Sequence, residues 1–167
     1  KPLYAFRQVQ PFAAIITAGF LELIIKTTVI FLLYIALYLL DETFVLNDPL
    51  LLIFLFTMLW VFGVAVGMLF AIASAFVPEV DKIKSMLSRP LLFISCVFFS
   101  LQDVPEEVWP YLTWNPLVHF NELARFACFE SYGQHGVNIS YILEITTVTL
   151  FLSLSLYHIT WKKVLSR

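Results

Sequence analysis

The sequence predicts an all-α membrane protein that forms a single transmembrane domain over residues 1–167. The first observation is composition: 60% of the residues are hydrophobic and only 13% are charged, whereas soluble domains carry about a quarter charged residues. The second is a set of long apolar runs. The runs 12–40, 49–77 and 139–161 exceed the about 20 residues that a helix needs to cross a bilayer core, and 85–101 approaches that length. We therefore expect four transmembrane helices.

The first span follows a polar lead-in, residues 1–11, in which Pro11 suits the first turn of a helix because its missing N–H costs nothing there. Within the span 12–40, Glu22 and Lys26 are spaced i,i+4 and can pair on one helix face. Ionisable residues at membrane depth are often functional. The alternative is a structural pair that faces a neighbouring helix or lies near the cytoplasmic headgroups. We favour the structural pair.

The second span, 49–77, contains small residues at every fourth position, a pattern that lets another helix approach closely. We expect helix packing there, within the chain or between subunits, rather than a ligand site. The four small residues are Gly63, Gly67, Ala71 and Ala75.

The stretch from residue 78 to 138 departs from the regular pattern of spans. A polar hinge, 78–88, leads into the short apolar run 85–101, which breaks into the polar, aromatic and proline-rich segment 102–138. Such backbone survives at membrane depth only where protein or a water-filled path covers it. We therefore predict a re-entrant helical hairpin on the outer side, and this hairpin is the first candidate for a functional surface.

The distribution of basic residues predicts the orientation. After the last span, residues 162–167 form a basic tail. If both ends lie in the cytoplasm, the inner segments carry eight Lys and Arg residues, whereas the outer segments 41–48 and 102–138 carry only Arg125. Cytoplasmic loops are enriched in Lys and Arg. The count therefore favours cytoplasmic ends and an even number of spans.

Enzyme motifs are missing from the sequence: it has no phosphate-binding loop, no nucleophile triad and no metal-ligand spacing. His119 and Cys128 are too sparse for a zinc site, and we interpret Cys96 and Cys128 as packing residues. We expect no catalytic residue, no cofactor, no metal and no nucleic-acid partner for this chain.

Two groups of side chains in the broken region have alternative interpretations. Trp109, Tyr111 and Trp114 are either interface anchors or stacking surfaces for sugar rings, whose C–H faces are apolar. His119, Glu122 and Arg125 occupy nearly one helix face. They form either a salt-bridged face or the lining of a path.

Three stretches of the sequence together resemble a known family. They are FRQVQP, RPLLFISCVFF and VPEEVWPYLTWNPLVHFNELAR, and they resemble the membrane subunit of bacterial capsule-polysaccharide ABC exporters, the KpsM-like group of type-2 ABC permeases. The resemblance covers essentially the whole chain and is strongest over 89–125. Family members have six spans after an interfacial helix, so we expect this chain to lack that helix and about the first two spans.

The resemblance implies partners and a location. We expect a second copy of the chain, two ATP-binding cassette subunits that hold ATP and magnesium, periplasmic and outer-membrane capsule export proteins, membrane lipid and a lipid-linked acidic polysaccharide. The location is the bacterial inner membrane. The residues expected to contact the ATPase are Tyr4, Arg7, Gln8, Glu79, Asp81 and Lys82. The residues expected to line the polymer path are Arg89, Phe98, Trp109, Tyr111, Trp114, His119 and Arg125.

Other functions remain as alternatives. A type-2 permease for O-antigen, teichoic acid or a small lipophilic molecule would differ only in its path-lining residues. An ion channel or secondary transporter needs a polar filter or coupled acids across its spans, for which only Glu22 and Lys26 qualify. A passive membrane scaffold would not need the broken segment.

Overall fold

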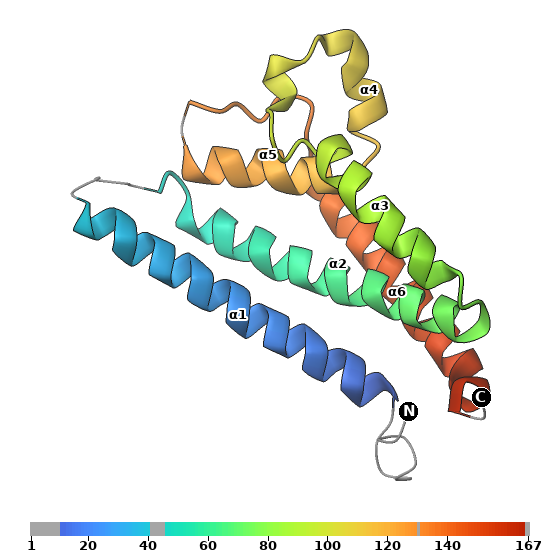
Figure 1. Cartoon of the computed structure of the whole chain (residues 1–167). Coiled ribbons are helices and arrows are strands. Elements are labelled where there is room, and N and C mark those ends of the chain that lie inside the picture. Colours follow the sequence, from blue (N-terminus) through green and yellow to red (C-terminus); the bar gives the residue numbers. More distant parts are fainter. Residues whose placement is uncertain (1–10, 41–45, 130, 166–167) are drawn as a thin grey trace.

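The computed structural model describes residues 11–40, 46–129 and 131–165, which form helices and turns without any strand. Three long helices dominate (Figure 1): α1 (Pro11–Leu39), α2 (Pro49–Phe76) and α6 (Ile139–Leu165). Between α2 and α6 lie α3 (Val80–Ile94), the 3-10 turns η2 (Leu101–Asp103) and η3 (Glu106–Val108), α4 (Trp109–Leu112) and α5 (Pro116–Cys128).

Polar caps and prolines determine where the helices begin. The Asp48 side chain accepts the Leu51 N–H at 3.0 Å, with Pro49 in the first turn of α2. The same arrangement begins α5, where the side chain of Asn115 accepts the N–H of Leu117 at 3.1 Å. A cap of this kind satisfies an N–H that has no partner inside the helix. Local sequence is therefore sufficient to set these two starting points.

The long helices run up and down in one bundle (Figure 1). α1 and α2 lie side by side and antiparallel, α6 lies against α2, and α5 crosses the beginnings of α2 and α6. The start of α1 and the end of α6 share one end of the bundle, which we call the terminal end. α4 and α5 lie at the opposite end, which we call the far end.

Three of the described helices are long and apolar enough to cross a membrane. These candidate spans are Phe12–Leu39, Pro49–Phe76 and Ile139–Thr160, and they coincide with the predicted spans 12–40, 49–77 and 139–161. The fourth predicted span, 85–101, is not confirmed. α3 begins at Val80, within the predicted hinge, and ends at Ile94. Its first half carries Asp81 and two lysines, so it is less apolar than the three candidate spans.

The predicted re-entrant hairpin, 102–138, folds against the bundle instead of extending away from it. Its described part contains η2, η3, α4 and α5, and the packing of α5 against α2 and α6 anchors it. Passage of this segment into a bilayer is not confirmed, because no membrane is present. What the structure establishes is a compact helical unit at the far end.

Two buried clusters lie around α5, and Ala65, Met68 and Ile72 are buried further along α2. Leu55, Phe120, Leu123 and Ile142 form one buried apolar cluster that joins these three helices. A second cluster contains Cys96, Leu101 and Val118 and connects the end of α3 to α5. Both clusters lie at the far end, so α5 is the element that organises packing there.

The middle of α1 packs closely against α2 around Gly19. The Trp60 indole N–H donates to the Gly19 carbonyl at 2.8 Å, and a Cβ placed on Gly19 would lie 2.7 Å from a methyl carbon of Val64. Elsewhere α1 is largely exposed, and the Glu22–Lys26 pair lies on its outer surface with a 4.0 Å separation and both side chains about two-thirds exposed (69% and 65%). The predicted pairing is thus present on an uncovered helix face.

Candidate functional site

The turn that ends α3 places several polar backbone groups between helices. Ser95 caps the helix, and Cys96 has a φ of 54°, in the left-handed region. A residue with a Cβ pays roughly 1–2 kcal/mol for that conformation. Carbonyls at a helix end have no partners inside the helix and need donors from elsewhere. In this protein the donors come from α5.

Glu122 is the centre of the contacts between α5 and this turn. Its side chain is 2% exposed and its carboxylate accepts the Ser100 hydroxyl at 3.0 Å and the Leu101 N–H at 2.8 Å. The Arg125 guanidinium forms an ion pair with the same carboxylate. A buried carboxylate is tolerated because these donors replace the water that it loses.

Arg125 and two asparagines hold the carbonyls of the turn. Arg125 donates to the carbonyl of Cys96 at 2.6 Å and to that of Val97 at 3.0 Å. The Asn121 amide donates to the Ser95 carbonyl at 2.7 Å, and the Asn115 amide donates to the Ser95 hydroxyl at 3.0 Å. We call this set the α3–α5 polar cluster; its side chains belong to Ser95, Ser100, Asn115, Asn121, Glu122 and Arg125.

His119 links α5 to the start of α6. Its Nδ1 accepts the Asn138 N–H at 3.0 Å, which assigns the ring proton to Nε2, 2.8 Å from the Thr113 carbonyl. The ring lies 4.6 Å from that of Tyr141, whose hydroxyl donates to the Trp114 carbonyl at 2.8 Å. Burial lowers the pKa of His119, and the backbone hydrogen bonds only partly oppose this shift. The histidine is therefore a neutral structural group.

The seven residues predicted to line a path divide into two groups. Arg89, Phe98, Tyr111 and Trp114 are exposed, and the last two are 81% and 83% exposed. Trp109, His119 and Arg125 instead make internal contacts. The Trp109 indole donates to the Val104 carbonyl at 2.9 Å, and its ring lies against Gly136. The structure does not bring the seven side chains together around one cavity, and their role in a path stays a prediction.

The remaining predicted residues are only partly described. Glu79, Asp81 and Lys82 are exposed at the beginning of α3, whereas Tyr4, Arg7 and Gln8 lie outside the described residues. Cβ atoms added to Gly63 or Gly67 would meet nothing within 4 Å. The two glycines of the stripe therefore face open space within the described residues, and the packing role of the stripe stays a prediction.

Sequence reasoning missed the other members of the α3–α5 polar cluster. Ser95, Asn115 and Asn121 were not predicted to act together, although Asn115 followed by Pro116 is a recognisable helix start. Ser100 and Asp103 also form a capping box around η2. Among the residues that the structure describes, no group of three or more His, Cys, Asp or Glu side chains could hold a metal ion.

Comparison with known proteins gives a direct match to the family predicted from the sequence. Two curated proteins from Escherichia coli, both named polysialic acid transport protein KpsM, are each 37% identical to this chain over 155 residues. The chain is similar to these two KpsM proteins. The alignment covers 93% of the KpsM-like chain but 60% of each relative, so the chain spans less than two-thirds of the length of these relatives. No protein-family model matches the KpsM-like chain.

Proposed function

We propose that this KpsM-like chain belongs to the membrane-spanning subunit of an ATP-driven exporter that moves lipid-linked capsular polysaccharide across the bacterial inner membrane. The observation that carries the proposal is the 37% identity to polysialic acid transport proteins over 93% of the chain. The three apolar helices of membrane-spanning length support it. The chain itself is the transport subunit, and a separate subunit hydrolyses ATP.

The proposed membrane arrangement uses residues 85–101, the second half of α3 and the turn after it, as a fourth crossing, and the far-end helices form a re-entrant outer unit. α3 has 15 residues, or about 22 Å, which is shorter than the about 30 Å hydrocarbon core. α2 and α6 both begin near α5 (Figure 1), so residues 77–138 return the chain toward the far end. The positions of the Lys and Arg residues favour a cytoplasmic terminal end.

The α3–α5 polar cluster supports a re-entrant far end. Irregular backbone at membrane depth needs internal hydrogen-bond partners. Glu122 and Arg125 provide them for Leu101, Cys96 and Val97. In this proposal Glu122 and Arg125 are positioning residues. They hold the turn after α3 in one conformation beside the polymer.

The polymer would contact the exposed members of the predicted path. Tyr111 and Trp114 present aromatic faces on which sugar rings can stack, and Arg89 offsets part of the negative charge of an acidic polymer. Stacking tolerates changes of register, so the chain can slide. Each contact has to stay weak, because a polymer that binds tightly at any one position cannot move on.

Transport also needs coupling to two ATPase subunits and a second permease copy. The exposed residues Glu79, Asp81 and Lys82 lie on the terminal end beside the α2–α3 turn. An ATPase seated there could pass its closure to α2 and α3, in the way that rigid-body motions are transmitted across interfaces. Residues 1–10, with Tyr4, Arg7 and Gln8, would add a second contact. Periplasmic and outer-membrane export proteins would receive the polymer.

The test is capsule export in a strain that lacks its own permease and expresses the double variant Arg89→Ala, Trp114→Ala. We expect export to fall at least about tenfold at normal permease levels, whereas Phe31→Ala, which removes an exposed aromatic of α1, leaves export unchanged. Normal export by the double variant would remove Arg89 and Trp114 from the path.

A second experiment addresses the cargo and the partner. The chain is expressed in strains that lack the permease for capsule, O-antigen or teichoic acid. If it restores the export of capsule but not of the other two polymers, the capsule assignment is supported; the reverse result favours one of these rival cargoes. Co-purification of an ATP-binding cassette subunit with the permease separates an exporter from a channel or a scaffold. Loss of that association in Glu79→Ala, Asp81→Ala would support the proposed contact.

A further inference from the structure

Two opposite charges lie uncovered in the middle of α1. Glu22 and Lys26 are 4.0 Å apart, and their side chains are 69% and 65% exposed. No other described residue forms a hydrogen bond or an ion pair with either side chain. We call these two residues the charge pair. α1 is a candidate membrane span, so the surroundings of the charge pair depend on how deep it lies.

Contacts with α2 determine the depth of the charge pair. The Gly19 carbonyl accepts the Trp60 indole N–H at 2.8 Å, and Trp60 is close to the midpoint of the 28-residue helix α2. Asp48 precedes α2 and Glu79 follows it, so this midpoint lies near the centre of the hydrocarbon core. Glu22, three residues beyond Gly19, is about 4.5 Å further along the axis, and the core extends about 15 Å to either side of its centre.

Some freedom in the position of α2 does not change this result. α2 is about 42 Å long, about 12 Å longer than the hydrocarbon core is thick. A shift of half that excess toward either membrane surface still leaves Glu22 inside the core. The charge pair therefore lies deep in the membrane and not among the headgroups.

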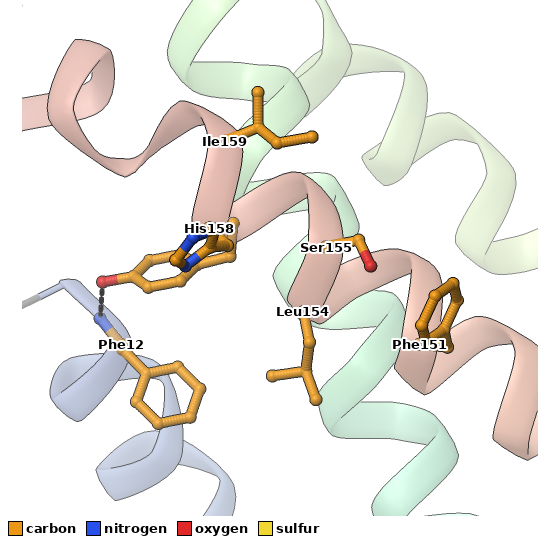
Figure 2. Close-up of a pocket in the computed structure, with 7 residues that line it drawn as sticks. Phe12, Phe151, Leu154, Ser155, His158 and Ile159 are labelled. Atoms are coloured by element: carbon orange, nitrogen blue, oxygen red, sulfur yellow. Dashed lines mark hydrogen bonds between the residues drawn. The ribbon is translucent and has the colours of Figure 1, made fainter.

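α1 contacts the bundle at two levels, and neither contact covers the charge pair. At the start of the helix, the Phe12 N–H donates to the Tyr157 hydroxyl at 3.3 Å (Figure 2). Further along, Gly19 packs against Trp60. The charge pair follows both contacts and has an open side within the described part of the chain.

The charge pair and Gly67 of α2 face the same side of the two helices. Glu22 is three positions after Gly19, and Gly67 is three positions after Val64, which Gly19 contacts. Each step of three residues turns a side chain about 60° away from the contact line in the same rotational sense. Because α1 and α2 are antiparallel (Figure 1), equal rotations point to the same side. We call this side, with Glu22 and Lys26 on α1 and Gly67 on α2, the charged flank.

The chemistry of the charged flank favours protein as its neighbour. Charges in the hydrocarbon core almost always face protein or a water-filled cavity, which excludes lipid. A water-filled path needs a polar wall along the helix, whereas Ala18 and Val29, one turn before and two turns after Glu22, are apolar. A Cβ on Gly67 would meet nothing within 4 Å, and small residues let another helix approach closely.

We propose that a membrane helix with polar side chains packs on the charged flank and forms hydrogen bonds or ion pairs with Glu22 and Lys26. This helix belongs to the part of the permease outside residues 1–167, because the matched part is 60% of each KpsM relative. It would bury α1 on a second side. The proposal goes beyond the export function and needs only that α1 and α2 span a membrane.

The first experiment uses the permease at its natural length, in lipid vesicles and in a cysteine-free background, with one spin label. The label is placed at Ala18→Cys on the charged flank or, as the matched control, at Ile24→Cys on the opposite side of α1. Collisions with molecular oxygen report lipid, and collisions with a water-soluble nickel chelate report water. We expect few collisions of either kind at residue 18 and several-fold more oxygen collisions at residue 24.

Depth alone cannot produce that result, because oxygen is most concentrated at the membrane centre and Ala18 is closer to the centre than Ile24. Frequent oxygen collisions at residue 18 would show that lipid covers the charged flank, and frequent nickel collisions would show a water-filled path. Magnetic coupling between labels at residue 18 of two permeases would show that a second copy covers it. Each of these three results would overturn the proposal.

The double variant Glu22→Leu, Lys26→Leu provides a second measurement. If a polar helix covers the charged flank, the variant leaves its polar groups unpaired, and the midpoint of thermal unfolding falls by about 4 °C or more. A higher midpoint would place the charge pair against lipid, and an unchanged midpoint would place it against water; either result contradicts the proposal. The matched control, Thr28→Leu, removes an exposed hydroxyl away from the charged flank and should not lower the midpoint. Neither experiment uses ATPase or polymer, so the export assignment is judged on its own tests.

Discussion

Glu122 accepts the backbone N–H of Leu101 at 2.8 Å although the two residues are 21 positions apart in the chain. The bond joins the middle of α5 to the first residue of η2, just after the turn that ends α3. The Glu122 carboxylate is buried, so it has lost its hydrating water. The hydrogen bonds that it accepts from the turn replace that water, and the same bonds order the turn. The conformation of residues 95–101 therefore depends on α5.

The first prediction concerns this carboxylate. Glu122→Gln keeps the size of the side chain but removes the charge that Arg125 pairs with and replaces one acceptor by a donor. Breaking a buried pair by changing one partner costs about 3–5 kcal/mol. Because Arg125 is partly exposed, we expect the free energy of unfolding to fall by about 2–4 kcal/mol. The measurement is the midpoint of thermal unfolding, which should be lower in the variant. Glu107→Gln, at an exposed position, is the matched control. Equal midpoints for both variants would contradict the role of Glu122.

The second prediction separates the aromatic residues of the far end. Trp109→Ala removes a half-buried ring and its hydrogen bond to Val104, so it should destabilise the protein by about 2–3 kcal/mol. Trp114→Ala removes an exposed ring and should cost less than about 0.5 kcal/mol. Thermal unfolding measures both effects. A Trp114→Ala variant that unfolds as readily as Trp109→Ala would show that Trp114 is a packing residue.

The third prediction is a pH dependence from His119. Because burial lowers its folded-state pKa, the unfolded chain binds the proton more readily. Its contribution to stability is complete above the unfolded pKa of about 6.5 and is lost progressively as the pH falls below that value. The loss is about 1.4 kcal/mol per unit of pKa lowering.

The measurement for His119 compares thermal unfolding at pH 7.5 and at pH 5.5. We expect His119→Gln to reduce the difference between the two midpoints. The control His135→Gln, which removes an exposed histidine, should keep the wild-type difference. An unchanged pH dependence in His119→Gln would assign that dependence to other groups.

The fourth prediction concerns the contact between α1 and α2. Gly19→Ala places a methyl group 2.7 Å from Val64, and overpacking of this kind costs about 1–3 kcal/mol. Gly63→Ala meets nothing within 4 Å and should be neutral or stabilising by up to about 1 kcal/mol, because alanine is the better helix former. Midpoints in detergent test both. Stability equal to the wild type in Gly19→Ala would mean that α1 moves away from α2 without cost.

Several features of the fold were predictable because their causes are local. Three spans follow from apolar runs of sufficient length, and Pro11 and Pro49 begin helices because proline suits a first turn. The Glu22–Lys26 pair follows from i,i+4 spacing. The resemblance to the KpsM-like permeases also followed from the sequence, since the order of motifs over 89–125 is specific. The end of the helix within 85–101 was not predictable, because the apolar sequence of this segment does not reveal that the helix ends at Ser95 and Cys96.

The candidate site was predictable only as a list of residue types. His119, Glu122 and Arg125 share a helix face in any α-helix, but their spacing cannot tell whether that face meets solvent, polymer or protein. The partners that decide it are Leu101, Cys96 and Asn138, which are 19 to 29 positions away in the chain. Long-range contacts of this kind leave no periodic pattern in the sequence.

By itself, the sequence determined that this is a helical membrane protein, which segments are long enough to span, and which family it resembles. The first two follow from hydrophobicity and length within single segments, and the resemblance follows from the order of motifs in three separate stretches. Only the tertiary structure decided that Glu122 and Arg125 hold the turn after α3 and that Tyr111 and Trp114 remain exposed. The physical reason is that burial is a property of two surfaces in contact, and the second surface comes from a distant part of the chain.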